Sequence, residues 1–359
     1  MAYQERKKLI AALEKLRGSR VICYFLPDRE TFPPNFPGFS TQISSEPHLL
    51  FIDHLRAIGK TAQLDLFLYT SGGATDAVWP LVNLLREHCE KLSVIVPFRA
   101  HSAGTLICLG AHEIVMTEWS ELSPIDPTTG NQFNPQDPAN PQNRLGISVE
   151  DVTAYFKLAA ERAGISAEPH KLEALKELTE KVHPLALGNV QRVYQQIREL
   201  ARKLLLLHLN EETHAQRVDQ TIKALTEEFY SHVHAITRAE AMPLLGDWVR
   251  PPSAEEESII WDLFNSYAET LELRCRFNLP EYMENEQTRD LKVIGGFLED
   301  SDLSHVHEMD LKIIQRPNLP PNIQVQVPQG ASLPLVPWAT RTYEPAVRAL
   351  GWKANERGT

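Results

Sequence analysis

Cysteine is scarce in this 359-residue chain, which has only four, and no two of them form a C-x-x-C pair. Cys23, Cys89, Cys108 and Cys275 lie far apart, in apolar or helical surroundings. This spacing excludes a disulfide framework and is typical of reduced thiols in a cytosolic protein. We therefore expect a cytoplasmic protein without disulfide bonds.

Runs of positive charge are also absent, and the net charge is -11 at pH 7. A nucleic-acid groove needs clustered lysine and arginine, so we expect no nucleic-acid partner. No apolar stretch reaches the length of a membrane span. The first residues, "MAYQERKKLIAALEKLRGSR", mix charged and apolar residues at helical spacing, which predicts a helix over 1–20 rather than a signal peptide or a membrane span.

What the chain does contain is a regular alternation of apolar runs and helical patterns from Arg20 to Met116. The successive segments are "VICYFL", "EPHLLFIDHLRAIG", "LDLFLYT", "ATDAVWPLVNLLREHCEK", "LSVIVPF", "SAGTLICLGA" and "HEIVM". This order predicts an α/β fold in which helices cover a parallel sheet. The length exceeds that of a usual single domain, so we expect a second domain or an appendage.

The segments after Met116 have weaker patterns. The range 127–146 is rich in proline, asparagine and glutamine and predicts a surface loop or flap. Ser148, with Asp151 three residues later, predicts the start of a helix that Gly164 ends. Helices dominate as far as about Leu209.

The C-terminal region is expected to be a small appendage or arm. The segments "DLKVIGGFLE" and "HEMDLKIIQ" predict two paired strands, whereas the stretch over 316–337 has too much proline for a central strand. We therefore divide the chain into an N-terminal helix over 1–20, a main domain over 21–278 that includes the helical segment, and a C-terminal part over 279–359.

The stretch "FRAHSAGTLICLGAHEIVM" places Ser102 where a strand leads into a helix. Acyl transfer needs a nucleophile, a base and backbone N–H donors for the oxyanion. Ser102 can supply the nucleophile, and the unpaired amides at the helix start, with small Ala103, can supply donors. In "YTSGGATDA", Gly72 and Gly73 follow another strand and would lie at the same edge of the sheet.

Simpler interpretations of these residues stay open. A lone serine at such a junction is more often a helix cap, and a glycine pair after a strand is more often a tight turn. The G-x-S-x-G motif of another hydrolase fold is not matched, because Ala100 replaces its first glycine.

The motifs taken together resemble a known family. "LDLFLYTSGGATDA", "VIVPFRAHSAGTLICLGAHEIVM" and "LSPIDP" are similar to the serine dehydrogenase proteinases, relatives of signal peptide peptidase A and of the proteolytic subunit of Clp protease. The resemblance is strong over Leu64–Pro127. It implies a Clp/crotonase-like fold, with Ser102 as the nucleophile and Gly72, Gly73 and Ala103 as oxyanion donors.

The catalytic base is harder to assign. The Clp branch of this superfamily has a histidine after the serine, whereas "SPIDP" here places Asp126 near that position. Signal peptide peptidases use a lysine instead, and the matching position in this chain is Arg192, which stays protonated. That departure leaves open an inactive member of the family. The downstream lysines available as alternatives are Lys157, Lys171, Lys176, Lys181 and Lys203.

Lys181 and His183, in "TEKVHPLALG", are the base candidates that we favour. They lie at a break between two helices, from which a side chain can turn toward the sheet. A tuned lysine or histidine is the kind of group that such a site requires. The simpler interpretation is a solvated helix-end charge for Lys181 and a residue preceding a helix-starting proline for His183.

Two His-x-His pairs raise the question of a metal site. His232 with His234, and His305 with His307, would each face one side of a strand. No cysteine, aspartate or glutamate supports either pair at a suitable spacing, so we expect no metal and no cofactor.

The sequence therefore predicts a cytosolic serine peptidase that acts on peptide or protein substrates through a Ser102 acyl-enzyme. We also expect a symmetric homo-oligomer, as is usual for such folds. Two alternatives remain: an inactive or regulatory protein of the same fold, and thioester chemistry of the acyl-CoA type. Ser102 argues against the second, because a hydratase uses acidic residues rather than a nucleophile.

Overall fold

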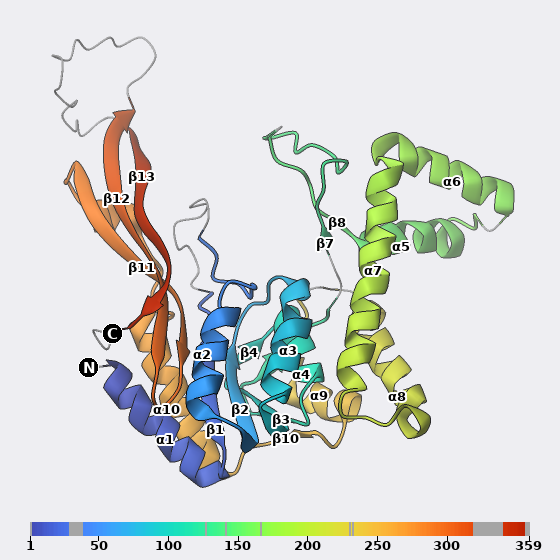
Figure 1. The fold of residues 1–359 in the computed structure, drawn as a ribbon. Coiled ribbons are helices and arrows are strands. Elements are labelled where there is room, and N and C mark those ends of the chain that lie inside the picture. The colour runs from blue at the N-terminus through green and yellow to red at the C-terminus, as the bar shows by residue number, and fades with distance from the viewer. Residues whose placement is uncertain are drawn as a thin grey trace. The chain divides into compact units, whose positions relative to one another are not determined.

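The structure, a computed structural model, describes residues 2–28, 39–125, 128–140, 142–165, 167–229, 231, 233–318 and 340–355. The chain forms two compact units. The first unit comprises Met1–Ser71 and Ser253–Thr359, and the second unit is Gly72–Pro252. Figure 1 labels most of the helices and strands of both units.

The first unit contains a sheet with the strand order β2-β1-β11-β12-β13. Its strands are β1 (Arg20–Phe25), β2 (Thr61–Tyr69), β11 (Thr288–Glu299), β12 (Ser304–Asn318) and β13 (Thr340–Ala354). Its helices are α1 (Ala2–Arg17), α2 (His48–Ile58), α10 (Ala254–Thr270) and α11 (Leu279–Met283). Strands β1 and β2 are parallel, and the strands from β11 onward are antiparallel to their neighbours.

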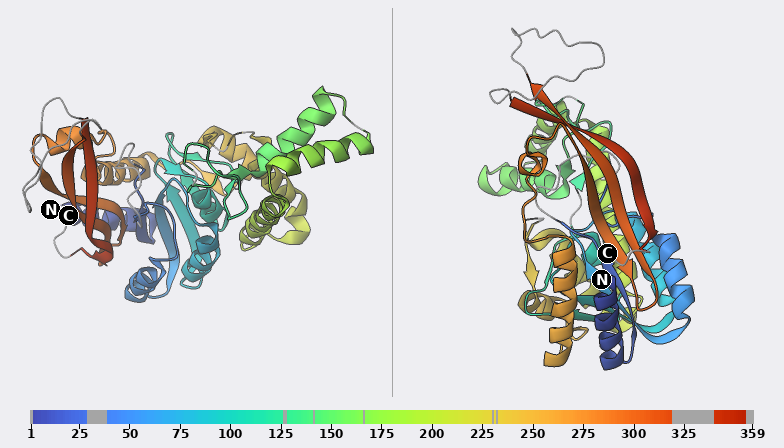
Figure 2. Two further views of the ribbon diagram at one scale, coloured as in Figure 1. Left: turned by 90° about the horizontal axis from the view of Figure 1, so that it is seen from above. Right: turned by 90° about the vertical axis from the view of Figure 1, so that its left-hand side faces the viewer.

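Two neighbouring aromatic residues of β1 explain how the helices cover this sheet. Tyr24 and Phe25 point to opposite faces, because successive side chains of a strand alternate. Tyr24 meets Phe51 of α2 edge-on, with ring centroids 5.2 Å apart, whereas Phe25 stacks on Tyr267 of α10 at 4.5 Å. Helix α1 packs beside α10, as Figure 2 shows. Thus α2 covers one face, and α10 with α1 covers the other.

A buried ion pair ties α1 to the sheet of the first unit. Arg6 contacts Glu299 with two nitrogens, at 2.7 and 2.9 Å, and neither side chain is exposed. Tyr267 donates its hydroxyl hydrogen to the same carboxylate at 2.8 Å. Burial is the main cause that raises the pKa of Tyr267 well above its ordinary value, so the phenol stays neutral.

Strands β11, β12 and β13 form a long twisted ribbon (Figure 1). β11 pairs with β12 from Thr288↔Ile314 to Glu299↔Ser304, with a register shift between Ile294 and Gly296. β13 is the outermost strand of the sheet, and most of its residues are exposed. It carries four charged residues and a proline, namely Arg341, Glu344, Pro345, Arg348 and Lys353.

The second unit has a parallel sheet of order β10-β5-β3 and a small sheet of order β4-β6-β9. Its strands are β3 (Cys89–Val96), β4 (Arg99–Ala100), β5 (Glu113–Met116), β6 (Glu121–Leu122), β7 (Thr128–Thr129), β8 (Ile147–Ser148), β9 (Ile236–Thr237) and β10 (Val249–Arg250). Its α-helices are α3 (Val78–Arg86), α4 (Ala103–Leu109), α5 (Val149–Lys157), α6 (Glu168–Lys181), α7 (Pro184–Leu205), α8 (Glu211–Lys223) and α9 (Arg238–Leu245). Shorter turns are a 3₁₀ turn at Thr75–Ala77 and π-helical turns at Leu158–Arg162 and Ala224–Glu228.

Helix α4 is apolar on all sides and completely buried. It ends at Gly110, where α3 and α7 come close. A Cβ atom there would lie 2.6 Å from Val82 Cγ1 and 3.0 Å from Leu204 Cδ2. The absence of a side chain at Gly110 therefore lets α4 pack tightly between its two neighbouring helices.

The structure confirms the predicted α/β class, with parallel strands and covering helices. The alternation expected from Arg20 to Met116 appears as β1, α2, β2, α3, β3, α4 and β5. The two expected C-terminal strands pair as β11 and β12. Ser148 caps α5 by accepting the Asp151 N–H, as predicted. Strand β13 was not expected, and the boundaries proposed at 20 and 278 remain predictions.

Candidate active site

Ser102 lies in a sharp turn between β4 and α4. Its backbone has φ 49° and ψ -109°, in the region that favours glycine. Although Ser102 precedes the first residue of α4, its side chain makes no capping hydrogen bond. In the part of the chain that the structure describes, the Ser102 hydroxyl has no hydrogen-bond partner. The serine is therefore not a helix cap, and its hydroxyl is available for chemistry.

Two buried hydroxyls hold this turn in place. Ser123 accepts the Ser102 backbone N–H at 2.8 Å. The Thr105 hydroxyl, in the first turn of α4, shares its one hydrogen between the carbonyl oxygens of Ala100 and Ser123, at 2.9 and 3.0 Å, and accepts the Ser123 N–H at 3.1 Å. These bonds connect β4, α4 and the segment after β6. They can hold the backbone of Ser102 in a conformation that costs about 1–3 kcal/mol.

The glycine pair approaches Ser102 closely. Gly72 and Gly73 have φ values of 110° and 146°, which residues with side chains rarely adopt. A Cβ atom at Gly72 would lie 2.9 Å from Ser102 Cβ and 3.1 Å from the His101 carbonyl oxygen. Only glycine allows this approach without displacing the serine. The Ala103 N–H, at the start of α4, donates to no acceptor within the described ranges.

An ion cluster that our sequence analysis missed borders the turn. The His101 side chain lies next to Glu121, with Nε2 3.0 Å from a carboxylate oxygen. Arg99 donates to the same oxygen at 2.8 Å. The pairing of β4 with β6 creates this cluster, because it places Arg99 opposite Glu121. His101 directly precedes Ser102 in the sequence, but its partner Glu121 lies twenty residues later, across a strand pair that the sequence does not reveal.

Lys181 and His183 lie at the junction of α6 and α7, where both side chains are exposed. His183 is the N-cap of α7, and its Nδ1 accepts the Leu185 N–H at 3.1 Å. Its ring stacks on Phe133 at 4.9 Å. No contact in the described structure joins either candidate to Ser102. Because Nδ1 of His183 is occupied as an acceptor, His183 must release the helix cap or use its other nitrogen to act as a base.

The other basic residues considered lie in separate places. Lys171 and Lys176 form exposed ion pairs with Glu168 and Glu173 along α6. Arg192 is exposed on α7 and donates to Asn189. Lys157 ends α5, and Lys203 is an exposed residue near the end of α7. Asp126 lies outside the described residues.

The structure describes one complete His-x-His pair, His305 with His307, and both rings contact other side chains. The ring of His307 stacks between Phe39 and Trp352, at 5.0 and 5.2 Å, and burial lowers its pKa to about 4. His305 Nδ1 lies 3.0 Å from a nitrogen of buried His54. Of the other pair, His232 lies outside the described residues. Among the residues that the structure describes, no group of three or more histidine, cysteine, aspartate or glutamate side chains could hold a metal.

None of the helices in the described ranges combines the length and the apolar composition needed to cross a bilayer.

Comparison with known proteins agrees with the site. Residues 1–155 match the family model described as ClpP-like SDH-type serine proteinase. This match confirms the resemblance that the motifs around Gly72 and Ser102 indicate. It covers both residues and the whole of α4, whereas Lys181 and His183 lie beyond it.

Two uncharacterized proteins of Methanocaldococcus jannaschii are related in sequence. MJ1495 is 32% identical over 184 residues, which are 49% of this chain and 61% of the relative. MJ0137 is 29% identical over 158 residues, which are 44% of this chain and 55% of the relative. The chain thus spans less than two thirds of the length of either relative.

Two solved structures of the 1510-N membrane-bound stomatin-specific protease are similar in part. One is a serine-to-alanine mutant with a TM-score of 0.34 and 16% identity, covering 59% of this chain and 75% of that one. The other is a lysine-to-alanine mutant in complex with a substrate peptide, with a TM-score of 0.32 and 14% identity, covering 62% of this chain and 94% of that one.

Proposed function

We propose that this chain, whose first 155 residues match the ClpP-like SDH-type serine proteinases, is a serine peptidase that forms an acyl-enzyme on Ser102. The observation that carries the proposal is the Ser102 turn. A serine hydroxyl that caps no helix stands on a strained backbone, and Gly72 lies close beside it. A serine with only a structural role would have no need of this strain.

In the proposed reaction, the Ser102 oxygen attacks the carbonyl carbon of a peptide bond while a base takes the hydroxyl proton. The carbon–nitrogen bond then breaks, and the amine leaves with that proton. Water hydrolyses the resulting ester and restores the serine. The Ala103 N–H and the Gly72–Gly73 turn stabilise the oxyanion, whereas the Ser102 N–H is already bonded to Ser123.

The proposed base is Lys181 or His183. Both are exposed at the junction of α6 and α7, so either side chain can reorient without unpacking a core, although His183 would leave its stacking contact with Phe133. A substrate peptide or a neighbouring copy of the chain can favour that reorientation, because catalytic contacts often tighten only in the substrate complex.

The cellular location, the oligomeric state and the substrate class are also proposals, which are supported by the cysteine content and the family match. None of the four cysteines, Cys23, Cys89, Cys108 and Cys275, forms a disulfide bond, which supports a cytosolic location. The proposed substrates are peptides or proteins, as the family match suggests for a relative of signal peptide peptidase A. We also propose a homo-oligomer, because most soluble oligomers are assembled from identical chains.

One observation favours a second candidate, an inactive or regulatory member of the same family. The Ser102 hydroxyl contacts no base in the described structure, and the position that resembles the family lysine is Arg192. In that protein, the Ser102 turn would bind peptide carbonyls without cleaving them.

A fluorophosphonate probe separates the two candidates, because it labels only an activated serine. We expect labelling of the wild-type chain and of Ser231→Ala, a control at an exposed serine, and none of Ser102→Ala. A wild-type chain that stays unlabelled and cleaves no peptide library would favour the inactive protein. Labelling that persists in Ser102→Ala would contradict the assignment of the nucleophile.

A further inference from the structure

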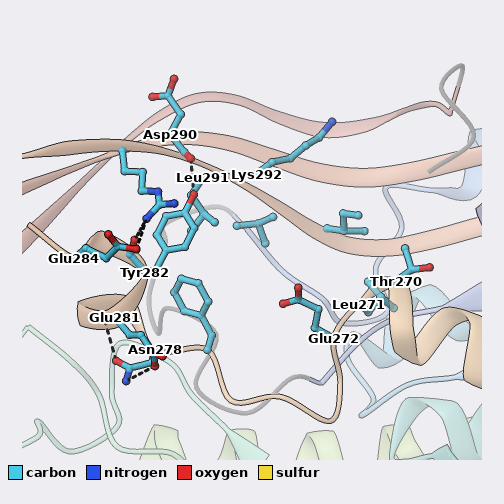
Figure 3. Close-up of a pocket in the computed structure, with 14 residues that line it drawn as sticks. Thr270, Leu271, Glu272, Asn278, Glu281, Tyr282, Glu284, Asp290, Leu291 and Lys292 are labelled. Atoms are coloured by element: carbon cyan, nitrogen blue, oxygen red, sulfur yellow. Dashed lines mark hydrogen bonds and ion pairs between the residues drawn. The ribbon is translucent and has the colours of Figure 1, made fainter. Parts of the chain in front are cut away.

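The first unit has a groove of about 710 Å³ between β11 and the segment that leads from α10 to α11. Figure 3 shows Asp290, Leu291 and Lys292 of β11 along one side and Glu281 and Tyr282 of α11 across from them. The consecutive residues from Arg289 to Ile294 line the groove. Because neighbouring residues of a strand point to opposite faces, such a run shows that the groove follows the edge of β11 rather than one face.

Within the residues that the structure describes, this edge of β11 is unpaired over most of its length. On one side β11 pairs with β12 along nearly its whole length. On the other side, β1 pairs only with the end of the strand, from Phe297 to Glu299. Within the described ranges, no strand pairs with the groove side between Thr288 and Ile294. An unpaired strand edge offers N–H and C=O groups to an added strand.

Two hydrogen bonds identify the residues whose backbone groups face the groove. Gln287 directly precedes β11, and its carbonyl accepts the N–H of Gln315 in β12, so the backbone of Gln287 points away from the groove. The Asp290 carbonyl accepts from the Tyr282 hydroxyl at 2.6 Å, so its backbone points into the groove. Backbone direction alternates along a strand, and therefore the N–H and C=O groups of Lys292 and Ile294 also face the groove.

The side chains around this edge determine which peptide would fit. Leu291 and Val293 are buried in an apolar cluster, and Phe277 and Tyr282 pack against that cluster from across the groove.

The lining contains four carboxylates and two cations. The guanidinium of Arg289 lies 4.4 Å from the centroid of the Tyr282 ring, and Lys292 pairs with Glu308 at 2.7 Å. Asp290 pairs with Arg348 at 2.8 Å, and Glu284 lies 3.8 Å from Arg289. The exposed Glu281 accepts a hydrogen bond from the Asn278 amide and pairs with no cation within the described residues.

We propose that this groove binds an extended peptide segment with alternating apolar and basic residues, which adds to β11 as a further strand. The backbone groups of Lys292 and Ile294 supply the hydrogen bonds, the apolar floor takes alternate side chains, and the Glu281 carboxylate at the rim selects lysine or arginine. The proposed site does not involve Ser102, so it goes beyond the peptidase proposal and can fail or succeed independently of it.

The test is fluorescence anisotropy with a labelled peptide, Thr-Leu-Lys-Val-Lys-Leu-Thr, and the full chain carrying Ser102→Ala, so that no hydrolysis interferes. The same peptide with glutamate in place of lysine is the charge control, and we expect it not to bind. Two further versions are N-methylated, one at the lysine amides and the other at the leucine and valine amides. In an added strand only one of these sets faces β11, so one version should lose about tenfold in affinity and the other should keep it.

Protein variants connect the binding to this groove. Glu281→Arg should weaken the lysine peptide about threefold or more, because it reverses a charge at the rim. Glu255→Arg, an equal change at an exposed residue of α10, is the matched control and should have no effect. Absence of binding, equal effects of the two methylation patterns, or equal effects of the two arginine variants would overturn the proposal.

Discussion

At the scale of single residues, Ser102 combines an unfavourable backbone conformation with a hydroxyl that makes no capping hydrogen bond. Its positive φ is unfavourable for any residue except glycine, yet a serine is present there. Strained residues of this kind cluster at functional sites, where neighbouring bonds hold them in place. The hydroxyl makes no hydrogen bond to the helix end that it would otherwise cap.

Gly72→Ala should reduce fluorophosphonate labelling by about 100-fold, because the new Cβ would meet Ser102 Cβ at 2.9 Å and displace the nucleophile or an oxyanion donor. The melting temperature should fall as well, since φ is 110°. The matched control is Gly188→Ala in α7, where a Cβ meets no atom within 4 Å. That variant should gain about 0.5–1 kcal/mol of stability and keep its labelling rate. If Gly72→Ala is labelled at the wild-type rate, Gly72 serves only to form the turn and has no part in the reaction.

The base is tested by two substitutions that preserve local structure. His183→Asn keeps an oxygen that can accept the Leu185 N–H and cap α7, but it removes the imidazole. Lys181→Met keeps the length of the side chain but removes the amine. If the chain is active, one of the two variants should lose acylation of Ser102, measured as the rate of probe labelling. Wild-type rates in both would show that the base lies elsewhere, with His101 the next residue to substitute.

The sequence directed attention to Ser102 and the glycine pair, which the structure places close together, but it did not reveal the surroundings of Ser102. The catalytic roles of these residues stay predictions. Ser102 and Gly72 each follow an apolar strand, and the parallel arrangement brings strand ends together at one edge. No sequence pattern identifies Ser123, because a single serine in "LSPID" gives no indication that its hydroxyl accepts the Ser102 N–H. The partner of His101 likewise depends on a strand pair of two residues.

At the scale of elements, the short strands β4 and β6 determine how α4 begins. Their pairing places Ala100 next to Leu122, so that Ser123 and Thr105 come into reach of each other. The turn of Ser102 is thus fixed by an element that follows it in the chain. Tight coupling of this kind is what a site needs when its geometry must hold within a fraction of an ångström.

Ser123→Ala should slow the acylation of Ser102 about tenfold or more, because the Ser102 N–H would lose its acceptor and the turn would relax. Ser123→Thr keeps a hydroxyl and should restore part of the rate. The measurement is the rate of labelling at saturating and limiting probe, beside the urea midpoint. A loss of stability without any change in saturated rate would indicate a purely structural serine.

Element prediction succeeded where one face or both faces of an element are buried. The run "VICYFL" is buried along β1, and its apolar residues are therefore continuous. Strand β13 escaped prediction because most of its residues are exposed and carry no apolar alternation. Its pairing with β12, rather than its own side chains, makes it a strand.

At the scale of the whole molecule, acidity acts on charge and on the core together. The net charge is -11 at pH 7 and the sequence pI is about 5.7, so the repulsion that keeps copies apart fades as the pH falls toward that value. As the pH falls through the same range, the buried His307 of the first unit stays neutral in the folded chain, whereas the unfolded chain takes up a proton at this residue, which lowers the free energy of unfolding.

His307→Phe should flatten the acid loss of stability. Burial lowers the pKa of His307 to about 4 in the folded chain, whereas an unfolded histidine titrates near 6.5. The unfolded chain therefore binds more protons between these values, and stability falls by about 3 kcal/mol as the pH drops from about 6.5 to about 4. Urea midpoints over this range are the measurement, with His170→Asn at an exposed position as control. Parallel curves for wild type and His307→Phe would contradict the assignment.

Strand β13 has a consequence for how crowded copies of this chain behave. As the last strand of its sheet, it could template endless stacking of one copy on the next, which is the route to fibrils. Its charged residues and Pro345 oppose such stacking, because proline cannot donate a ladder bond and like charges repel along two aligned edges. Replacing Pro345 and Arg348 by valine would remove two of the residues that oppose this stacking, and the chain would then polymerise more readily.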